Sequence, residues 1–292
     1  MLISTLELLR AAHRRNYAVG AFNVYNLEGV VAVVAAASYN HSPAILQVHP
    51  GAMIHSGHLL AALCLNAAQD AAVPISLQFD HGTSSAQIQS ALKQGFSSVM
   101  FDGSELPYSR NLQCTLDLAH LAHSHGVAIE AELGRLTGAE DGVNVPEYRE
   151  KLTDPVQAIE FVERTRVDAL AVCIGNVHGP YLREPELDFD RLKKIRDSVR
   201  VPLVLHGASG LQETLVHRSI ELGVRKFNVN TEVREAYIDT LRTRLATSST
   251  KRPDLGDLMK EAVMAMQAVV SSKLRLFGSV GMADFAHTDA AP

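Results

Sequence analysis

The sequence predicts a (β/α)8 barrel with additional C-terminal helices, and three observations support this fold class. Eight short, mostly apolar segments rich in β-branched residues recur along the 292-residue chain, and amphipathic segments separate them. Nearly continuous apolar runs are typical of parallel strands that are covered on both faces. The alternation of strands and helices favours a barrel. No Gly-x-Gly-x-x-Gly motif follows the first strand, which counts against an open, doubly wound sheet.

The predicted elements alternate along the chain. Strands are expected at residues 18–24, 43–49, 74–81, 97–103, 128–134, 169–175, 202–207 and 226–230. Helices are expected at residues 27–40, 86–95, 110–126, 155–165 and 215–223. Gly95, Gly126 and Gly223 follow three of these helices, where glycine favours the left-handed conformation that ends a helix.

The region after the last strand is predicted to be a helical extension at about residues 233–278, interrupted by a polar stretch at 247–257. No shift in composition marks a domain boundary, so we expect residues 1–292 to form a single domain. The longest interval between strands, 135–168, is polar and rich in glycine. A long loop after a barrel strand is commonly a lid or an active-site loop.

Composition and charge limit the function classes. The chain is 47% hydrophobic and 20% charged, with a net charge of −5, which argues against disorder and against attraction to nucleic acid or anionic membranes. The three cysteines, Cys64, Cys114 and Cys173, include no Cys-x-x-Cys pair, which suits a reducing compartment. Neither a signal peptide nor an apolar run of about 20 residues is evident. We expect a soluble cytoplasmic protein with no membrane or nucleic-acid partner.

Polar residues collect at the C-terminal ends of the predicted strands, where barrel enzymes place their active sites. The chain has 13 histidines, of which ten are scattered over predicted helices and loops and three lie at strand ends. The residues at these ends include Asn23, Asp80, His81, Asp102, Glu132, His178, Gly179, His206, Gly207, Asn228, Asn230 and Thr231.

Three of these residues are candidate metal ligands. Three neutral imidazoles with an open fourth position form a catalytic Zn²⁺ site, and His81, His178 and His206 come from three different strands. One such histidine alone would be interpreted as an unrelated rim residue. All three precede glycine and lie at predicted strand ends, which favours metal binding.

The carboxylates allow more than one interpretation. Asp80 and His81 are consecutive, so their side chains point to opposite faces of a regular strand, and both serve one site only where the strand bends. Near a metal, Asp80 would be a general acid–base group or a residue that orients His81. Asp102 and Glu132 would bind a second cation, orient the histidines or form an ordinary ion pair.

Glycine-rich turns end the last two predicted strands. The segments HGASG (206–210) and NVNTE (228–232) occupy the position where barrels of this type bind phosphate. Gly207 permits close approach of the backbone, and Ser209 and Thr231 offer hydroxyl groups. The alternative is that tight turns require glycine without any ligand.

Other histidines are interpreted as surface residues, although their spacing suits a helical metal site. They lie away from the strand ends, at His55, His58, His120, His123 and His125.

Several linked motifs resemble those of class II, zinc-dependent ketose-bisphosphate aldolases. They are FDHG (79–82), EAELGRLTGAEDG (130–142), GNVHGPY (175–181), LHGASG (205–210) and NVNTE (228–232). The resemblance extends from about residue 3 to residue 275. The segment HGPYLREPELDF (178–189) is most similar to the fructose-bisphosphate branch, and LHGASG is more similar to the tagatose-bisphosphate branch.

This resemblance implies reversible cleavage of a ketose bisphosphate, fructose 1,6-bisphosphate first, to dihydroxyacetone phosphate and glyceraldehyde 3-phosphate. Zinc, held by His81, His178 and His206, would polarise the ketone and stabilise the enediolate. Asp80 would move the proton of the hydroxyl that becomes the aldehyde, and Glu140 would exchange the proton at the enediolate carbon.

The resemblance also implies further ligands and a homo-oligomer, either a dimer or a tetramer. A monovalent cation (Na⁺ or K⁺) and the phosphate would lie among Gly179, Gly207, Ser209, Asn228 and Thr231. Asn23 and Asn230 would be further substrate-binding residues. Asp102 and Glu132 match the place of a second or displaced metal.

Two departures from the family pattern leave the aldehyde half of the substrate open. His49 stands where the family often has Ser or Thr, and Gly256 stands about where many members carry an arginine that reaches the distal phosphate. One alternative is therefore tagatose bisphosphate or another ketose phosphate. A non-catalytic sugar-phosphate-binding module is a second alternative, but such a protein needs no proton-transfer groups.

Overall fold

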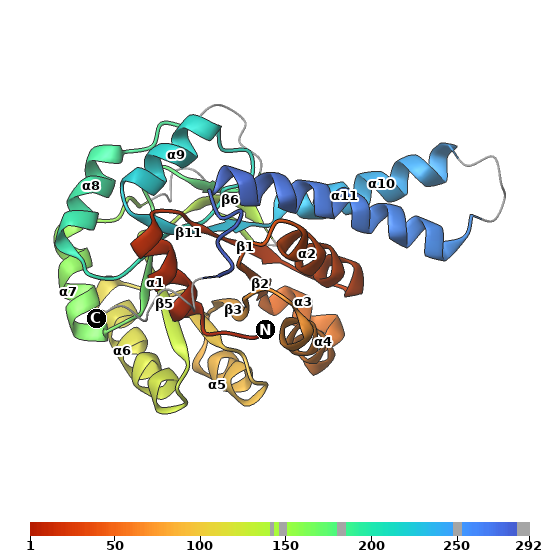
Figure 1. Cartoon of the computed structure of the whole chain (residues 1–292). Helices are drawn as coiled ribbons and strands as arrows, with labels where there is room; N and C mark the ends of the chain where they lie inside the picture. The colour runs from red at the N-terminus through yellow and green to blue at the C-terminus, as the bar shows by residue number, and fades with distance from the viewer. Residues whose placement is uncertain (141–142, 146–150, 180–184, 248–252, 285–292) are drawn as a thin grey trace.

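A closed barrel of eight parallel strands forms the centre of the protein. We describe a computed structural model over residues 1–140, 143–145, 151–179, 185–247 and 253–284. The barrel strands are β1 Val19–Asn23, β2 Ala44–Val48, β3 Ile75–Gly82, β4 Ser98–Phe101, β5 Ala128–Leu133, β8 Ala169–Val172, β10 Leu203–Leu205 and β11 Val224–Val229. They close in the order β1–β11–β10–β8–β5–β4–β3–β2 (Figure 1). The predicted fold class is confirmed, and each strand overlaps a predicted segment.

Helices form the outer layer around this barrel (Figure 1). They are α2 Leu27–Tyr39, α3 Pro50–Ser56, α4 His58–Asp70, α5 Ser85–Lys93, α6 Tyr108–Ser124, α7 Pro155–Thr165, α8 Phe189–Ser198 and α9 Glu213–Glu221. The sequence analysis did not predict α3, α4 and α8. In α8 the cause is visible, because only Leu192 and Ile195 are buried and the other positions are mostly charged.

The helix α1 Thr5–Arg15 closes the N-terminal end of the barrel, and it was not predicted either. Thr5 Oγ1 forms hydrogen bonds with the hydroxyls of Ser76 and Ser98. The apolar side of α1 packs against side chains of the barrel in one buried cluster, Leu8, Leu9, Ala11, Ala12, Tyr17, Val19, Ala21, Ile45, Met100, Ala169, Ala171 and Val204.

The other half of the barrel interior is polar. Gln47, Gln78, Glu130 and Lys226 are each 3% exposed or less, and they bond to one another inside the barrel. Buried polar groups require partners. This layer therefore fixes the side chains at the C-terminal ends of the strands.

A small second sheet is separate from the barrel. It consists of β6 Thr137–Glu140, β7 Val143–Val145 and β9 Val177–His178, in the order β7–β6–β9. The sequence analysis predicted a loop at 135–168 and a strand at 169–175. The barrel strand β8 instead ends at Val172, so the prediction that His178 ends a barrel strand was wrong. His178 lies in β9, which pairs with β6.

The C-terminal helices, α10 Thr231–Thr247 and α11 Leu255–Leu276, confirm the predicted extension. Together they project from the barrel as an arm, and α11 returns beside α2 (Figure 1). At the base of the arm, Asn40 Nδ2 donates to Ser271 Oγ over 3.0 Å. The rings of Phe227 and Phe277 stack with centroids 4.8 Å apart.

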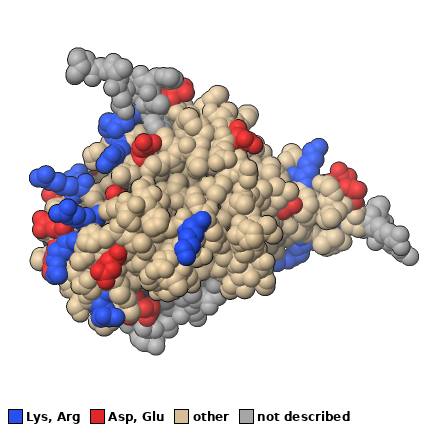
Figure 2. All heavy atoms as spheres, turned by 90° about the horizontal axis from the view of Figure 1, so that it is seen from below, with Lys and Arg blue, Asp and Glu red and all other residues tan. Residues whose placement is uncertain are grey.

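Charges of both signs occur on the face shown in Figure 2, where lysines and arginines gather at the end opposite the arm and are interleaved with acidic residues. This face therefore shows no broad single-signed patch. Within the described residues, no single helix is long and apolar enough to cross a membrane, although the bent pair α3–α4 meets those criteria jointly.

Candidate metal centre and active site

A bulge at the end of β3 brings two consecutive side chains to one site. Between β3 and β4 the pairing changes from Phe79 with Val99 to Gly82 with Phe101, so β3 contains one extra residue. His81 lies at this bulge with a φ of 45°. Such bulges redirect side chains. The bend that the sequence required is therefore present, and Asp80 and His81 share one site.

Three imidazole rings meet at the C-terminal end of the barrel. One ring nitrogen from each of His81, His178 and His206 lies within 4.8 Å of those of the other two. His81 Nε2 is 2.9 Å from His206 Nδ1, and the His81 and His178 ring centroids are 5.2 Å apart. The structure therefore brings together the three histidines that the sequence singled out, although they lie on β3, β9 and the end of β10 rather than all on barrel strands.

The protonation of two of these histidines suits metal binding. Burial, with the positive charge of His81, lowers the pKa of His178 to about 3. Burial also lowers the pKa of His206. Burial would lower the pKa of His81 too, but the carboxylates of Asp80 and Asp102 raise it well above its usual value. A neutral imidazole is the form that binds metal, and His178 and His206 are neutral at pH 7.

A second group of possible ligands shares His81. His81 Nδ1 lies 2.8 Å from Asp102 Oδ2, and oxygen atoms of Asp102 and Glu132 lie within 4.8 Å of a His81 nitrogen and of each other. Burial and the charge of Asp102 raise the pKa of Glu132 well above its usual value. Glu132 Oε2 is buried and has no hydrogen-bond partner among the described residues. A buried carboxylate oxygen without a hydrogen-bond donor is a suitable ligand for a cation.

Asp80 is held by three amide groups. Its carboxylate accepts from Asn23 Nδ2 at 2.9 Å, from Gln47 Nε2 at 3.1 Å and from Asn228 Nδ2 at 3.3 Å. Burial would raise its pKa, but the positive charges of His81, His206 and Lys226 and the bond from Asn23 lower it. Asp80 is therefore ionised at pH 7 and fixed in orientation.

A buried ion pair that the sequence analysis missed orients His206. Glu130 Oε1 lies 2.9 Å from His206 Nε2, and Glu130 Oε2 lies 2.8 Å from Lys226 Nζ. Lys226 Nζ also donates to Asn228 Oδ1 at 2.7 Å. The available signal was a two-residue spacing of polar side chains inside apolar strands, Glu130 with Glu132 and Lys226 with Asn228, which places each pair on one face.

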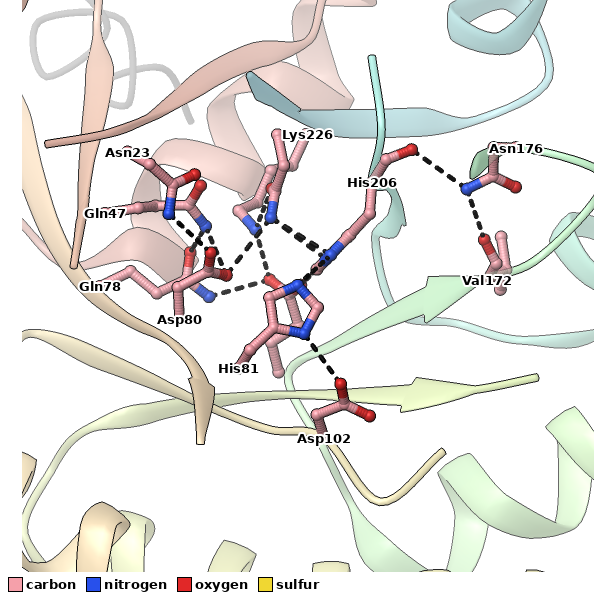
Figure 3. Close-up of polar contacts among 12 residues, drawn as sticks. Asn23, Gln47, Gln78, Asp80, His81, Asp102, Val172, Asn176, His206 and Lys226 are labelled. Carbon is pink, nitrogen blue, oxygen red and sulfur yellow. Dashed lines mark hydrogen bonds and ion pairs between the residues drawn. The ribbon is translucent and has the colours of Figure 1, made fainter. Parts of the chain in front are cut away.

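The backbone around the histidines is held by an amide and a glycine. Asn176 Nδ2 donates to the carbonyl oxygens of Val172 and His206 at 3.4 and 3.1 Å (Figure 3). Gly207 has a φ of 67°, and a Cβ there would lie 1.8 Å from the Val177 carbonyl oxygen. Only glycine permits this approach, which places β9 beside the end of β10.

Most of the predicted phosphate residues lie at the ends of β10 and β11, and Gly179 follows β9. Ser209, Asn228, Asn230 and Thr231 are each less than 9% exposed, and Gly179 has a φ of 81°. Asn230 Oδ1 accepts from Tyr25 Oη at 2.8 Å. One backbone amide of the HGASG turn (206–210) already has a hydrogen-bond acceptor, since Gly210 N donates to Glu232 Oε1 at 2.6 Å.

The structure places the remaining predicted residues in different surroundings. Glu140 ends β6, and its side chain is not among the described ones. Gly256 lies in the first turn of α11, and this helix begins at the outer end of the arm (Figure 1). His49 Nδ1 accepts from Gly51 N at 3.0 Å, and its ring centroid is 6.1 Å from that of His81. The histidines interpreted as surface residues, His55, His58, His120, His123 and His125, are exposed.

Comparison with known proteins identifies the family. The family model described as fructose-bisphosphate aldolase class-II matches residues 3–282. The chain belongs to the class II fructose-bisphosphate aldolase family.

Solved structures agree with this assignment. This aldolase is 36% identical to the YdjI aldolase from Escherichia coli K12, with a TM-score of 0.87 over 97% of this chain and 100% of that chain. It is 37% identical to a candidate fructose-1,6-bisphosphate aldolase from Coccidioides immitis, with a TM-score of 0.90 over 96% and 98% of the two chains. The fold is shared with the fructose-bisphosphate aldolase of Campylobacter jejuni, at 24% identity and a TM-score of 0.79 over 96% and 97%.

Proposed function

We propose that this aldolase is a zinc-dependent enzyme that reversibly cleaves a ketose bisphosphate, with fructose 1,6-bisphosphate as the leading substrate. The products would be dihydroxyacetone phosphate and glyceraldehyde 3-phosphate. The observation that carries the proposal is the convergence of His81, His178 and His206 beside the ionised carboxylate of Asp80. A module that only bound a sugar phosphate would need no such carboxylate.

The three histidines would hold the metal, with neutral imidazole nitrogens as the donors that Zn²⁺ prefers. When bound, zinc supplies Lewis-acid polarisation of the substrate carbonyl oxygen. Glu130 would fix the ring of His206, because its bond to Nε2 leaves Nδ1 facing His81. Asp102 would do the same for His81 through Nδ1. With Glu132, Asp102 is also the proposed place of a second metal.

Proton transfer would fall to two carboxylates. In cleavage, Asp80 accepts the proton of the hydroxyl on the carbon that becomes the aldehyde. The bond from that carbon to its ketose-side neighbour breaks, and the electron pair stays on the ketose-side fragment. We assign to Glu140 the delivery of a proton to that fragment. The amides of Asn23, Gln47 and Asn228 keep Asp80 in the orientation for the first step.

The phosphate of the dihydroxyacetone half would bind at the ends of β10 and β11, with a monovalent cation (Na⁺ or K⁺) nearby. Gly179 and Gly207 let backbone amides approach the ligand, and Ser209 and Thr231 supply hydroxyls. Asn228 lies near the end of β11, and Asn230 follows that strand. The Glu232 carboxylate accepts from Gly210 N. A bound phosphate would either displace this carboxylate or bind only to the neighbouring backbone amides.

A second substrate is favoured by two residues of this chain. Gly256 has no side chain to reach a distal phosphate, and His49 places an imidazole near His81. Both favour tagatose bisphosphate or a ketose phosphate with a different aldehyde half.

The test is a coupled cleavage assay with fructose 1,6-bisphosphate, tagatose 1,6-bisphosphate and fructose 1-phosphate, with and without a chelator. We expect turnover of a bisphosphate that a chelator removes and added zinc restores. Chelator-insensitive turnover would refute the zinc mechanism. No turnover of any of the three ketose phosphates would favour another substrate or a binding module.

We further propose that the protein is a homo-oligomer in the cytoplasm. The arm exposes Ile238, Leu245, Leu255 and Met264 to solvent, which supports α10 and α11 as a contact between copies. The free cysteines Cys64, Cys114 and Cys173 support a reducing compartment. Light scattering of the purified protein would give the number of subunits, and a monomer would contradict the first proposal.

A further inference from the structure

A hollow of about 580 Å³ opens at the N-terminal ends of the barrel strands, the opposite end from the three imidazoles. Its walls come from α1, from the end of α8 and from the residues just before β8, β10 and β11. The positively charged and histidine side chains that line it are Arg10, His13, Arg14, Arg196, Arg200 and Arg225. Five arginines around one hollow are unexpected in a chain whose net charge is −5.

Arg225 is a buried cation paired only with neutral groups. It is 5% exposed. It donates to the carbonyl oxygens of Ile220 and Val224 at 2.7 and 2.8 Å and to Asn16 Oδ1 at 2.9 Å. Its Nε is buried and has no hydrogen-bond partner among the described residues. Burial and the positive charge of Arg196 lower its pKa, yet a guanidinium stays protonated. A buried charge without a counter-ion is costly.

The carboxylates near the hollow are already engaged. Asp168, the acidic residue in its lining, accepts from Ile129 N at 2.8 Å and lies 2.9 Å from His123 Nε2. Arg196 Nε lies 2.6 Å from Asp197, which also binds Lys193. Arg10 and Arg200 are exposed. No carboxylate of the described residues contacts either of them.

Helix electrostatics explain only part of this charge. His13 and Arg14 lie in the last turn of α1, where cations favour the negative end of the helix dipole. Arg225 bonds the last turn of α9 through Ile220. Arg10 lies before the last turn of α1, and Arg200 follows the end of α8. Neither caps a helix, so their convergence needs a different explanation.

We propose that this hollow binds a small anion that carries at least two phosphate groups. Guanidinium groups form paired hydrogen bonds with phosphate oxygens, and the volume falls in the range of about 300–1,000 Å³ that small-ligand sites occupy. The lining contains no Phe, Tyr or Trp among its described residues. Recognition would therefore depend on phosphate charge and not on stacking of a base. This site does not depend on the proposed cleavage reaction.

The test is calorimetric titration of the purified protein with butane-1,4-diol bisphosphate, which has no ketone and cannot be cleaved. The Arg10→Gln/Arg200→Gln double variant removes the two exposed arginines and leaves Arg225 in place. Arg110→Gln, an exposed arginine at the start of α6 outside the hollow, is the matched control. The bisphosphate could also bind at the proposed active site, at the C-terminal ends of the strands. Binding there would be equal in the wild type, the double variant and Arg110→Gln.

We expect the wild type and Arg110→Gln to bind the bisphosphate equally. In the double variant we expect the affinity of one site to fall about tenfold or more, which corresponds to about 1.4 kcal/mol. Thermal unfolding without ligand should be unchanged, since neither arginine pairs within the fold. Equal binding by the double variant and the wild type would overturn the proposal, as would a double variant that loses stability without losing affinity.

Discussion

Glu130 Oε1 lies 2.9 Å from His206 Nε2, and its other oxygen lies 2.8 Å from Lys226 Nζ, so one buried carboxylate contacts both a histidine of the candidate metal centre and a lysine inside the barrel. The positive charge of Lys226, with the bond to His206, outweighs burial and lowers the pKa of Glu130. This carboxylate therefore links the stability of the barrel to the geometry of His206.

Replacing this carboxylate should reduce both stability and metal affinity. Glu130→Gln leaves Lys226 buried without a counter-ion, and removal of one partner of a buried pair costs about 3–5 kcal/mol. The substitution also removes the carboxylate that orients His206. Loss of such an orienting group typically lowers metal affinity by about 10–100-fold. Urea unfolding and titration with a competing zinc indicator would measure the two effects. Glu160→Gln, at an exposed ion pair on α7, is the control. A Glu130→Gln protein that matches this control would contradict the assignment.

Asp80→Asn should remove turnover and keep the metal. The amide has nearly the same shape but cannot accept a proton, and general acid–base catalysis contributes about 10²–10⁴-fold. We expect cleavage to fall by that factor while the zinc content stays near one per chain. Asp117→Asn, on the exposed side of α6, should leave both unchanged. Loss of zinc in Asp80→Asn would show instead that Asp80 serves to hold His81.

His178→Ala should abolish zinc binding and turnover together, because two imidazoles remain where three converge. The measurement is metal content by elemental analysis after dialysis, with cleavage assayed on the same sample. His120→Ala, which changes an exposed histidine of α6, should bind zinc as the wild type does. Full zinc content in His178→Ala would place the metal elsewhere, for example at Asp102 and Glu132.

The barrel and most strand-end residues could be predicted because both follow from local patterns. Apolar runs mark the strands, and parallel strands bring their C-terminal ends to one rim. The bulge at His81 could not be predicted, since it depends on how β3 pairs with β4. The Glu130–Lys226 pair joins residues 96 positions apart. Its two partners interrupt apolar strands, and only the closed barrel shows that they face each other.

The short strand β9 illustrates a different limit. Val177 and His178 form a strand only by pairing with Thr137 and Gly138 of a distant segment, and two residues carry no periodicity. The charged helix α8 was missed for the related reason that it buries few apolar side chains. Such elements take their structure from tertiary contacts and leave little trace in the local sequence.

Tyr17→Phe should increase stability and reduce its loss in alkali. Tyr17 is 1% exposed, and its hydroxyl has no partner among the described residues. Burial raises its pKa from 10.0 to about 12. The unfolded chain therefore releases the proton at lower pH than the native protein, and stability falls as the pH rises from about 10 to about 12.

The phenylalanine variant removes this titration and the cost of the unpaired hydroxyl, so we expect a gain of about 1 kcal/mol at neutral pH. Above pH 10 the gain should be larger. Urea unfolding below and above that pH measures both. Tyr39→Phe, at a side chain that is 77% exposed, should change neither value. A Tyr17→Phe protein less stable than the wild type would show that the hydroxyl has a partner in solution.

Gly207→Ala should damage the metal centre far more than an equally strained substitution elsewhere. A Cβ at Gly207 would lie 1.8 Å from the Val177 carbonyl oxygen, so β9 must move and carry His178 with it. Gly126 has a φ of 68° against 67° at Gly207, but a Cβ there meets nothing within 4 Å. Gly126→Ala should therefore destabilise the fold only by the strain of alanine in the left-handed backbone conformation, about 1 kcal/mol. We expect both variants to fold, with zinc affinity and cleavage reduced at least about tenfold in Gly207→Ala alone. Equal zinc affinity in the two variants would show that β9 does not set the position of His178.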